Sequence, residues 1–321
     1  MTGKIKIKQP VTLIIITCLV VFMLGAIFRL KSPNSIDELK KKNIEGFFIL
    51  TISTVIKAGF WKIDLKNAKP EMIAKNSMNM FKKGEKNQKR YTDPNLSPNN
   101  QILAYTLEFN GKKSVGLMTI DGLKEVPFVE LEDESIYNPT FSPDGKTIAM
   151  ISNDKIYITP YPPIKNIELQ SITQKEVSSN SLSWYSNNLI GYINKENIFK
   201  IVDIETAKTK PFIKAKQAAF SPDSNFLAIS TGKKLVIYSL QKARKTFEKN
   251  GTPFNTIKIR TLGQLTWSSD SSYILTSISE KSFSEKQNQT ALIDIKTGEI
   301  IYLPKSWKDS LSHAWSKPVS N

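Results

Sequence analysis

Few residues in this chain have the types and spacing that catalysis requires. His313 is the only histidine and Cys18 the only cysteine, so a histidine-pair metal site, a cysteine-based zinc site and an intramolecular disulfide are excluded. The sequence contains no Gly-x-Ser-x-Gly elbow, no phosphate-binding loop and no Gly-x-Gly-x-x-Gly fingerprint. We therefore expect no cofactor, no bound metal and no enzymatic activity, and we interpret His313 as a structural residue.

Aspartates recur at two equivalent places in the sequence. One set lies in turns of the Ser-Pro-Asp-Gly type: Asp144 with Gly145, Asp223 and Asp270. The other set follows predicted strands: Asp64, Asp203 and Asp294. Recurrence at equivalent positions is what a turn requires, because Asp side chains bond to nearby backbone amides. We interpret both sets as structural.

The basic residues suggest a binding surface. The net charge is +16, and residues 1–31 supply five of these charges without any acid. Other bases gather in segments predicted to connect strands: Lys82, Lys83, Lys86, Lys89, Arg90, Lys112, Lys113, Lys233 and Lys234. A docking face of this kind would attract an anionic partner, whereas the alternative is a set of ordinary solvated loops in a Lys-rich chain.

The elements that position these residues form a repeat. An aromatic or apolar residue is followed by Ser-Pro-Asp-Gly or a relative, and then by a short apolar strand. The copies begin at intervals of 36 to 48 residues: 96–100, 141–145, 184–188, 220–224, 267–271 and 315–316. Pro sets φ near −65°, Asp bonds locally, and Gly or Asn accepts a positive φ, so each copy predicts a tight turn between two antiparallel strands.

Two further strand patterns follow each turn, as at 155–159 and 234–240, or at 291–295 and 299–303. Four strands in about 40–45 residues are typical of one blade of a β-propeller. The motif at 141–158, aromatic-Ser-Pro-Asp-Gly-Lys, then Ile-Ala, then Ile-Tyr-Ile, resembles the WD40-like propeller repeats of the TolB family and of prolyl-oligopeptidase relatives. This resemblance implies a periplasmic or cell-surface scaffold. The chain departs from TolB because it has no room for an N-terminal α/β domain.

The two ends of the repeat region complement each other. Residues 47–53 and 59–65 read as second and third strands without a first strand, and residues 312–316 supply a first strand without the others. We therefore predict an all-β fold. It is a six-bladed β-propeller with four-stranded blades, closed by the C-terminal strand and preceded by one transmembrane α-helix.

That helix is predicted from the uncharged run at residues 11–28, whose length of about 27 Å approaches the ~30 Å hydrocarbon core. Lys4, Lys6 and Lys8 precede it, which favours a cytoplasmic N-terminus. The predicted organisation is a basic cytoplasmic tail (1–10), a membrane-spanning signal anchor (11–30), a linker with a short helix (31–43) and an extracytoplasmic propeller (44–321). A cleaved signal peptide and lipidation at Cys18 are the alternatives.

We expect a single-pass protein of the plasma (inner) membrane whose propeller binds a protein or an anionic envelope polymer. Export disfavours nucleic acid as a partner. One alternative is a propeller hydrolase or lyase acting on sugars or peptides through an acidic site at the channel mouth. Another is a sensor or assembly factor whose anchor helix binds a partner helix.

Overall fold

The computed structural model describes most of the repeat region. The described residues are 39, 41–42, 44, 46–52, 58–67, 69–76, 88–131, 134–162, 169–240, 253–259, 263–281, 286–304 and 313–316. The predicted membrane span, residues 11–30, lies outside them. In the part of the chain that is described, no helix combines the length and the apolar character needed to cross a bilayer.

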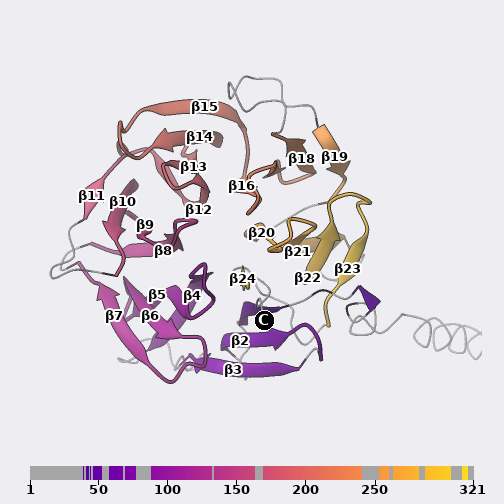
Figure 1. Ribbon diagram of the computed structural model, residues 1–321, viewed down its shortest axis with the longest axis horizontal. Helices are drawn as coiled ribbons and strands as arrows, with labels where there is room; N and C mark the ends of the chain where they lie inside the picture. Colours follow the sequence, from indigo (N-terminus) through magenta and orange to yellow (C-terminus); the bar gives the residue numbers. More distant parts are fainter. Residues whose placement is uncertain are drawn as a thin grey trace, which may run out of the picture.

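Six four-stranded antiparallel sheets stand around a central axis, as Figure 1 shows. From the innermost strand outwards, blade 1 comprises β24 (His313–Trp315), β1 (Phe47–Ile52), β2 (Gly59–Asp64) and β3 (Pro70–Lys75). Blade 2 comprises β4 (Lys89–Leu96), β5 (Ile102–Phe109), β6 (Lys112–Thr119) and β7 (Glu125–Val129). Blade 3 comprises β8 (Ile136–Phe141), β9 (Thr147–Ser152), β10 (Lys155–Pro160) and β11 (Gln170–Ser171). Blade 4 comprises β12 (Val177–Ser186), β13 (Leu189–Asn194), β14 (Ile198–Asp203) and β15 (Thr209–Lys214). Blade 5 comprises β16 (Gln217–Phe220), β17 (Phe226–Ser230), β18 (Leu235–Ser239) and β19 (Pro253–Ile257). Blade 6 comprises β20 (Thr266–Trp267), β21 (Tyr273–Lys281), β22 (Lys286–Asp294) and β23 (Ile300–Tyr302).

The ring closes through blade 1, where the C-terminal strand β24 pairs antiparallel with the N-terminal strand β1 (Figure 1). Trp315 lies opposite Phe48, and His313 lies opposite Leu50. The backbone N–H of Phe47 donates to Ser316 Oγ at 2.7 Å. The predicted six-bladed propeller and its closure by the C-terminal strand are therefore confirmed. Such closure pairs edges that would otherwise be open to other chains.

The repeated aspartates hold their turns together. In the best copy of the motif, Ser142 Oγ donates to Asp144 Oδ1 at 2.6 Å, and the backbone N–H of Lys146 donates to the same oxygen at 3.0 Å. Gly145 has a φ of +72°. The equivalent positions in other blades also adopt a left-handed φ: Asn100, Ser224 and Ser271. Local turn geometry accounts for the recurrence of these residue types.

The hydrophobic core lies between neighbouring blades, where the repeat aromatics pack. Trp184, for example, packs with apolar residues of blades 3 and 4 such as Ile151 and Ile190. The blade interiors are close-packed, because a Cβ added at Gly191 would lie 2.3 Å from Phe199 Cζ. The recurrence of the aromatics along the sequence therefore corresponds to one packing position per blade.

Two faces of the ring need names. The turn face carries the turns between first and second strands and between third and fourth strands. The loop face carries the turns between second and third strands and the connections from blade to blade. The predicted linker contributes to the core, because Leu39 is only 1% exposed and belongs to one cluster with blade-6 residues such as Leu292 and Leu303. Nearby, Lys42 Nζ lies 2.6 Å from Glu299 Oε2.

Candidate functional site: the channel mouth and the basic loop face

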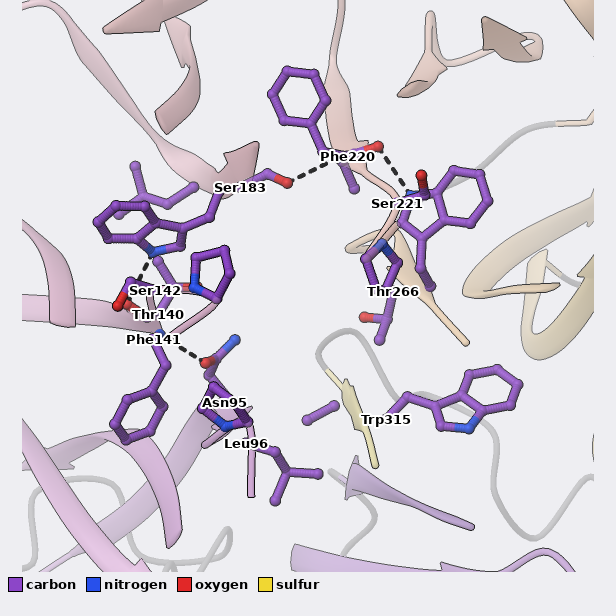
Figure 2. Close-up of a pocket in the computed structure, with 18 of the residues that line it drawn as sticks. Asn95, Leu96, Thr140, Phe141, Ser142, Ser183, Phe220, Ser221, Thr266 and Trp315 are labelled. Atoms are coloured by element: carbon purple, nitrogen blue, oxygen red, sulfur yellow. Dashed lines mark hydrogen bonds between the residues drawn. The ribbon is translucent and has the colours of Figure 1, made fainter. Parts of the chain in front are cut away.

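A cavity of about 460 Å³ lies at the centre of the ring and reaches the turn face. The innermost strand of every blade contributes to its lining, together with turn residues such as Pro98, Pro143 and Pro222. Figure 2 shows Asn95, Thr140, Ser183 and other lining residues arranged around the open centre. The volume lies within the range of pockets that bind small molecules or a few inserted side chains.

The lining of this cavity carries no formal charge at neutral pH. It contains no Asp, Glu, Lys or Arg. No group of three His, Cys, Asp or Glu side chains within the described ranges could hold a metal ion. This lining therefore does not supply the acidic site that the alternative prediction places at the channel mouth. The recurring aspartates point their carboxylates into their own turns, because each is held by the serine two residues earlier.

Hydrogen bonds between inner strands keep the mouth of the cavity rigid (Figure 2). Asn95 Oδ1 accepts from the backbone N–H of Phe141 at 2.9 Å, which links blades 2 and 3. Ser183 Oγ accepts from the backbone N–H of Phe220 at 2.8 Å, which links blades 4 and 5. Side-chain oxygens bound to backbone amides of the next blade make the cavity a preformed site.

Two tryptophans extend the same set of links. Trp184 Nε1 donates to the carbonyl oxygen of Thr140 at 3.2 Å, and Trp267 Nε1 donates to that of Ala219 at 2.9 Å. Each indole therefore ties its own blade to the blade before it. Trp315 occupies the equivalent place in blade 1, but its buried Nε1 has no hydrogen-bond partner among the described residues.

His313 is a neutral member of the lining. Its Nδ1 lies 2.7 Å from Thr266 Oγ1, and this hydroxyl donates to the His313 carbonyl oxygen at 3.0 Å. Since the hydroxyl has one proton, Nδ1 must be the donor to Oγ1, which leaves Nε2 as an acceptor. Nε2 is buried without a partner in the described structure. Burial lowers the pKa of His313 to about 3, so the ring is uncharged near neutral pH.

The predicted basic docking face divides into two parts. Lys82, Lys83 and Lys86 lie outside the described residues. In blade 2 the predicted bases have local partners: Arg90 lies 3.9 Å from Glu108, Lys112 lies 3.6 Å from Glu130, and the Lys113 ammonium lies 5.0 Å from the centre of the Tyr137 ring. Lys89, on β4, also has a partner.

Blade 5 differs from this paired part of the loop face. Lys233 and Lys234 are exposed in the turn between β17 and β18. The topology brings Lys214, Lys216 and Lys258 to the same end of the ring, and all three are exposed. The sequence analysis missed these three residues, because they lie at strand ends whose register only the structure defines.

Fold and site together define a class: a six-bladed, four-stranded β-propeller with an uncharged central cavity and exposed lysines at the loop-face end of blade 5. Neither the family models nor the curated protein sequences compared with this chain match it. Solved structures do match. TolB from Acinetobacter baumannii is similar with a TM-score of 0.67 and 12% identity, over 85% of this chain and 67% of that chain.

Two other solved propellers extend the comparison. A chain of the nidogen/laminin complex matches with a TM-score of 0.61 and 7% identity, over 84% of this chain and 98% of its own length. The propeller domain of Cps50 (Swd1) from Myceliophteria thermophila matches with a TM-score of 0.52 and 10% identity, over 81% and 84%. At these identities the similarity shows the fold alone. It confirms the predicted TolB-like propeller.

Proposed function

We propose that this protein is a membrane-anchored, extracytoplasmic propeller that acts as a binding scaffold. Its channel mouth would take a segment of a partner protein, and its loop face would take an anionic envelope polymer. The observation that carries the proposal is the neutral, preformed cavity at the turn face, lined by all six blades. A binding scaffold needs no reacting groups, and this lining offers hydrogen-bonding, aromatic and aliphatic surface without a charged side chain.

The chemistry of the cavity defines the segment that fits. Trp184, Phe220 and neighbouring apolar groups offer aromatic surface, while hydroxyl and amide groups such as Ser183 and Asn95 offer hydrogen bonds. A charged side chain would enter without a counter-ion, at a desolvation cost of several kcal/mol. We therefore expect a neutral loop or tail with one or two aromatic or apolar side chains.

The anchor is supported by the apolar run at residues 11–28. If the membrane span ends at residue 30, eight residues separate it from Leu39, which is packed on the propeller. At ~3.6 Å per residue these eight cover at most about 29 Å. The turn face would then be held close to the bilayer, where the channel mouth could meet the exposed part of another membrane-associated protein.

Site-specific crosslinking in the native membrane tests the proposal. A photoreactive residue is placed at Pro143 or Pro222, which are exposed at the cavity mouth, and as a control at Lys66, which is exposed on the outer part of the same face. We expect one crosslinked protein band from both mouth positions and none from Lys66. Equal crosslinking at all three positions, or none at the mouth, would argue against a channel-mouth site. Protease accessibility of the propeller in sealed vesicles, together with resistance to alkaline extraction, tests the topology.

A further inference from the structure

Five lysines gather on the loop face, four at the end of blade 5 and one, Lys214, at the end of the neighbouring strand β15 of blade 4. They are Lys214, Lys216, Lys233, Lys234 and Lys258, called here the blade-5 lysine cluster. Each is exposed. None of them takes part in an ion pair among the described residues. The lysines that do are Lys42, Lys112, Lys195 and Lys200.

The backbone brings these lysines together. The backbone N–H of Lys216 donates to the carbonyl oxygen of Ser230 at 2.7 Å, which sets Lys216 beside the end of β17. Its side chain lies against the next turn, because a Cβ at Gly232 would be 3.3 Å from Lys216 Nζ. Leu235 pairs with Ile257, so Lys234 and Lys258 occupy adjacent strand ends, about 5 Å apart in the sheet.

The cluster carries a large excess of positive charge, although Glu196 of the blade-4 turn lies near Lys214, which pairs with Ile198. Across the described residues of blade 5, the only acidic side chain is Asp223, which belongs to the turn face at the other end of the blade. The corresponding turn of blade 4 carries one charge of each sign, Lys195 and Glu196, and Lys195 pairs with Asp154 at 2.6 Å. Exposed like charges repel one another. A bound polyanion would therefore be attracted to the lysines and would also reduce the repulsion among them.

We propose that the blade-5 lysine cluster binds a linear, phosphate-rich polymer through the charged oxygens of several successive phosphate groups. The cluster is an exposed row at strand ends and not a cavity, which suits a chain better than a small ligand. Lysine supplies compact charges on flexible stems, which can follow a chain without fixed geometry. The proposal deepens the polymer-binding part of the proposed function and rests on it.

The position of the cluster argues against the lipid headgroups of the protein's own membrane. Lys42 pairs with Glu299 on the turn face, opposite the cluster, and only a short linker separates Lys42 from the proposed membrane span. A bilayer that holds residues 11–30 would then lie on the turn-face side. At 0.1 M salt, electrostatic attraction acts only within ~10 Å, so headgroups on the turn-face side would not attract lysines on the loop face. A polymer in the surrounding space can reach the loop face directly.

Binding of the full-length protein, in a neutral detergent, to fluorescently labelled inorganic polyphosphate tests this inference. The variant Lys216→Gln/Lys233→Gln/Lys234→Gln removes three charges from the cluster. The matched control Lys66→Gln/Lys69→Gln/Lys296→Gln removes three exposed charges from the turn face. We expect the cluster variant to bind at least tenfold more weakly in 50 mM salt. The slope of log affinity against log salt should also fall by about 2, at ~0.7 per phosphate contact. The control should bind within twofold of wild type.

Three results would overturn the proposal: equal losses in both variants, tighter binding of single-stranded DNA than of polyphosphate, or cluster-dependent binding of phosphatidylglycerol vesicles without polyphosphate binding. The variant Lys216→Arg/Lys233→Arg/Lys234→Arg keeps the charge and should retain binding, and unchanged melting temperatures exclude misfolding. Crosslinking from Pro143 should be the same in the cluster variant and in wild type. A failure of the polymer site is thereby distinguished from a failure of the channel-mouth site.

Discussion

Replacing the repeat tryptophans by phenylalanine separates the contribution of an indole hydrogen bond from that of buried surface. Trp184, Trp267 and Trp315 occupy equivalent positions and are 8%, 6% and 9% exposed, so the substitution removes nearly the same buried surface from each. Only the first two indoles donate a hydrogen bond, to the carbonyl oxygens of Thr140 and Ala219. The buried Nε1 of Trp315 has no partner among the described residues.

The magnitudes follow from this difference. The loss of ring volume should cost about 1–2 kcal/mol at every site. At Trp184 and Trp267 the variant also loses a hydrogen bond worth about 1 kcal/mol and leaves a carbonyl less well satisfied. At Trp315 the substitution instead removes a buried polar group that made no bond, which recovers part of the packing loss. We expect Trp315→Phe to be more stable than either of the other variants by at least about 1 kcal/mol.

Urea unfolding followed by circular dichroism measures the three free energies under one set of conditions. In thermal unfolding the same difference corresponds to about 2–4 °C for a domain of 150–250 residues. Leu123→Ala, at a side chain that is 86% exposed, serves as a control and should leave stability unchanged. If Trp315→Phe loses as much stability as Trp184→Phe and Trp267→Phe, the reasoning about the unpaired indole is refuted.

Three further predictions concern ring closure, pH and packing. A chain ending at residue 312 lacks β24 and should melt about 10 °C or more below wild type, whereas a chain ending at Ser316 keeps every described closure contact and should melt as wild type does. Because the pKa of His313 is lowered to about 3, the unfolded chain takes up a proton between pH 6.5 and 3 that the folded chain does not. Stability should therefore fall as pH decreases through this window, and His313→Asn should flatten that dependence in urea unfolding. Gly116→Ala would place a Cβ 2.4 Å from the Tyr105 hydroxyl oxygen and should lower the free energy of unfolding by about 1–3 kcal/mol, and an unchanged melting temperature would contradict this packing.

Much of the fold was predictable because the repeat is encoded locally. Proline at one turn position, a capping aspartate and a residue that tolerates positive φ specify the turn between the first and second strands. The turn around Asp144 and Gly145 matches its prediction because the bonds from Ser142 Oγ and from the Lys146 N–H to the Asp144 carboxylate join residues only two apart. The missing first strand of blade 1 was found from its complement at the C-terminus, because a propeller with an open blade would expose two strand edges.

The candidate site was less predictable. The choice of residues that line the cavity depends on the tilt of six strands about one axis, which no local pattern specifies. The lysines illustrate the same limit: Lys112 and Lys234 look alike in sequence, yet one lies 3.6 Å from Glu130 and the other stands in a blade end without acids. Pairing partners come from strands that are distant along the chain, so charge compensation is a property of the assembled blades.

Taken by itself, the sequence determined that this chain builds a repeated four-stranded unit, how many such units there are, and which end completes the ring. It did so because turn chemistry and strand periodicity act over a few residues. Tertiary structure alone decided that the channel mouth is neutral, that Leu39 joins the core of blades 1 and 6, and that the lysines of blade 5 stand at a blade end without acids among its described residues. Those outcomes depend on side chains brought together across blades, where burial and Coulomb interactions act through space and not along the chain.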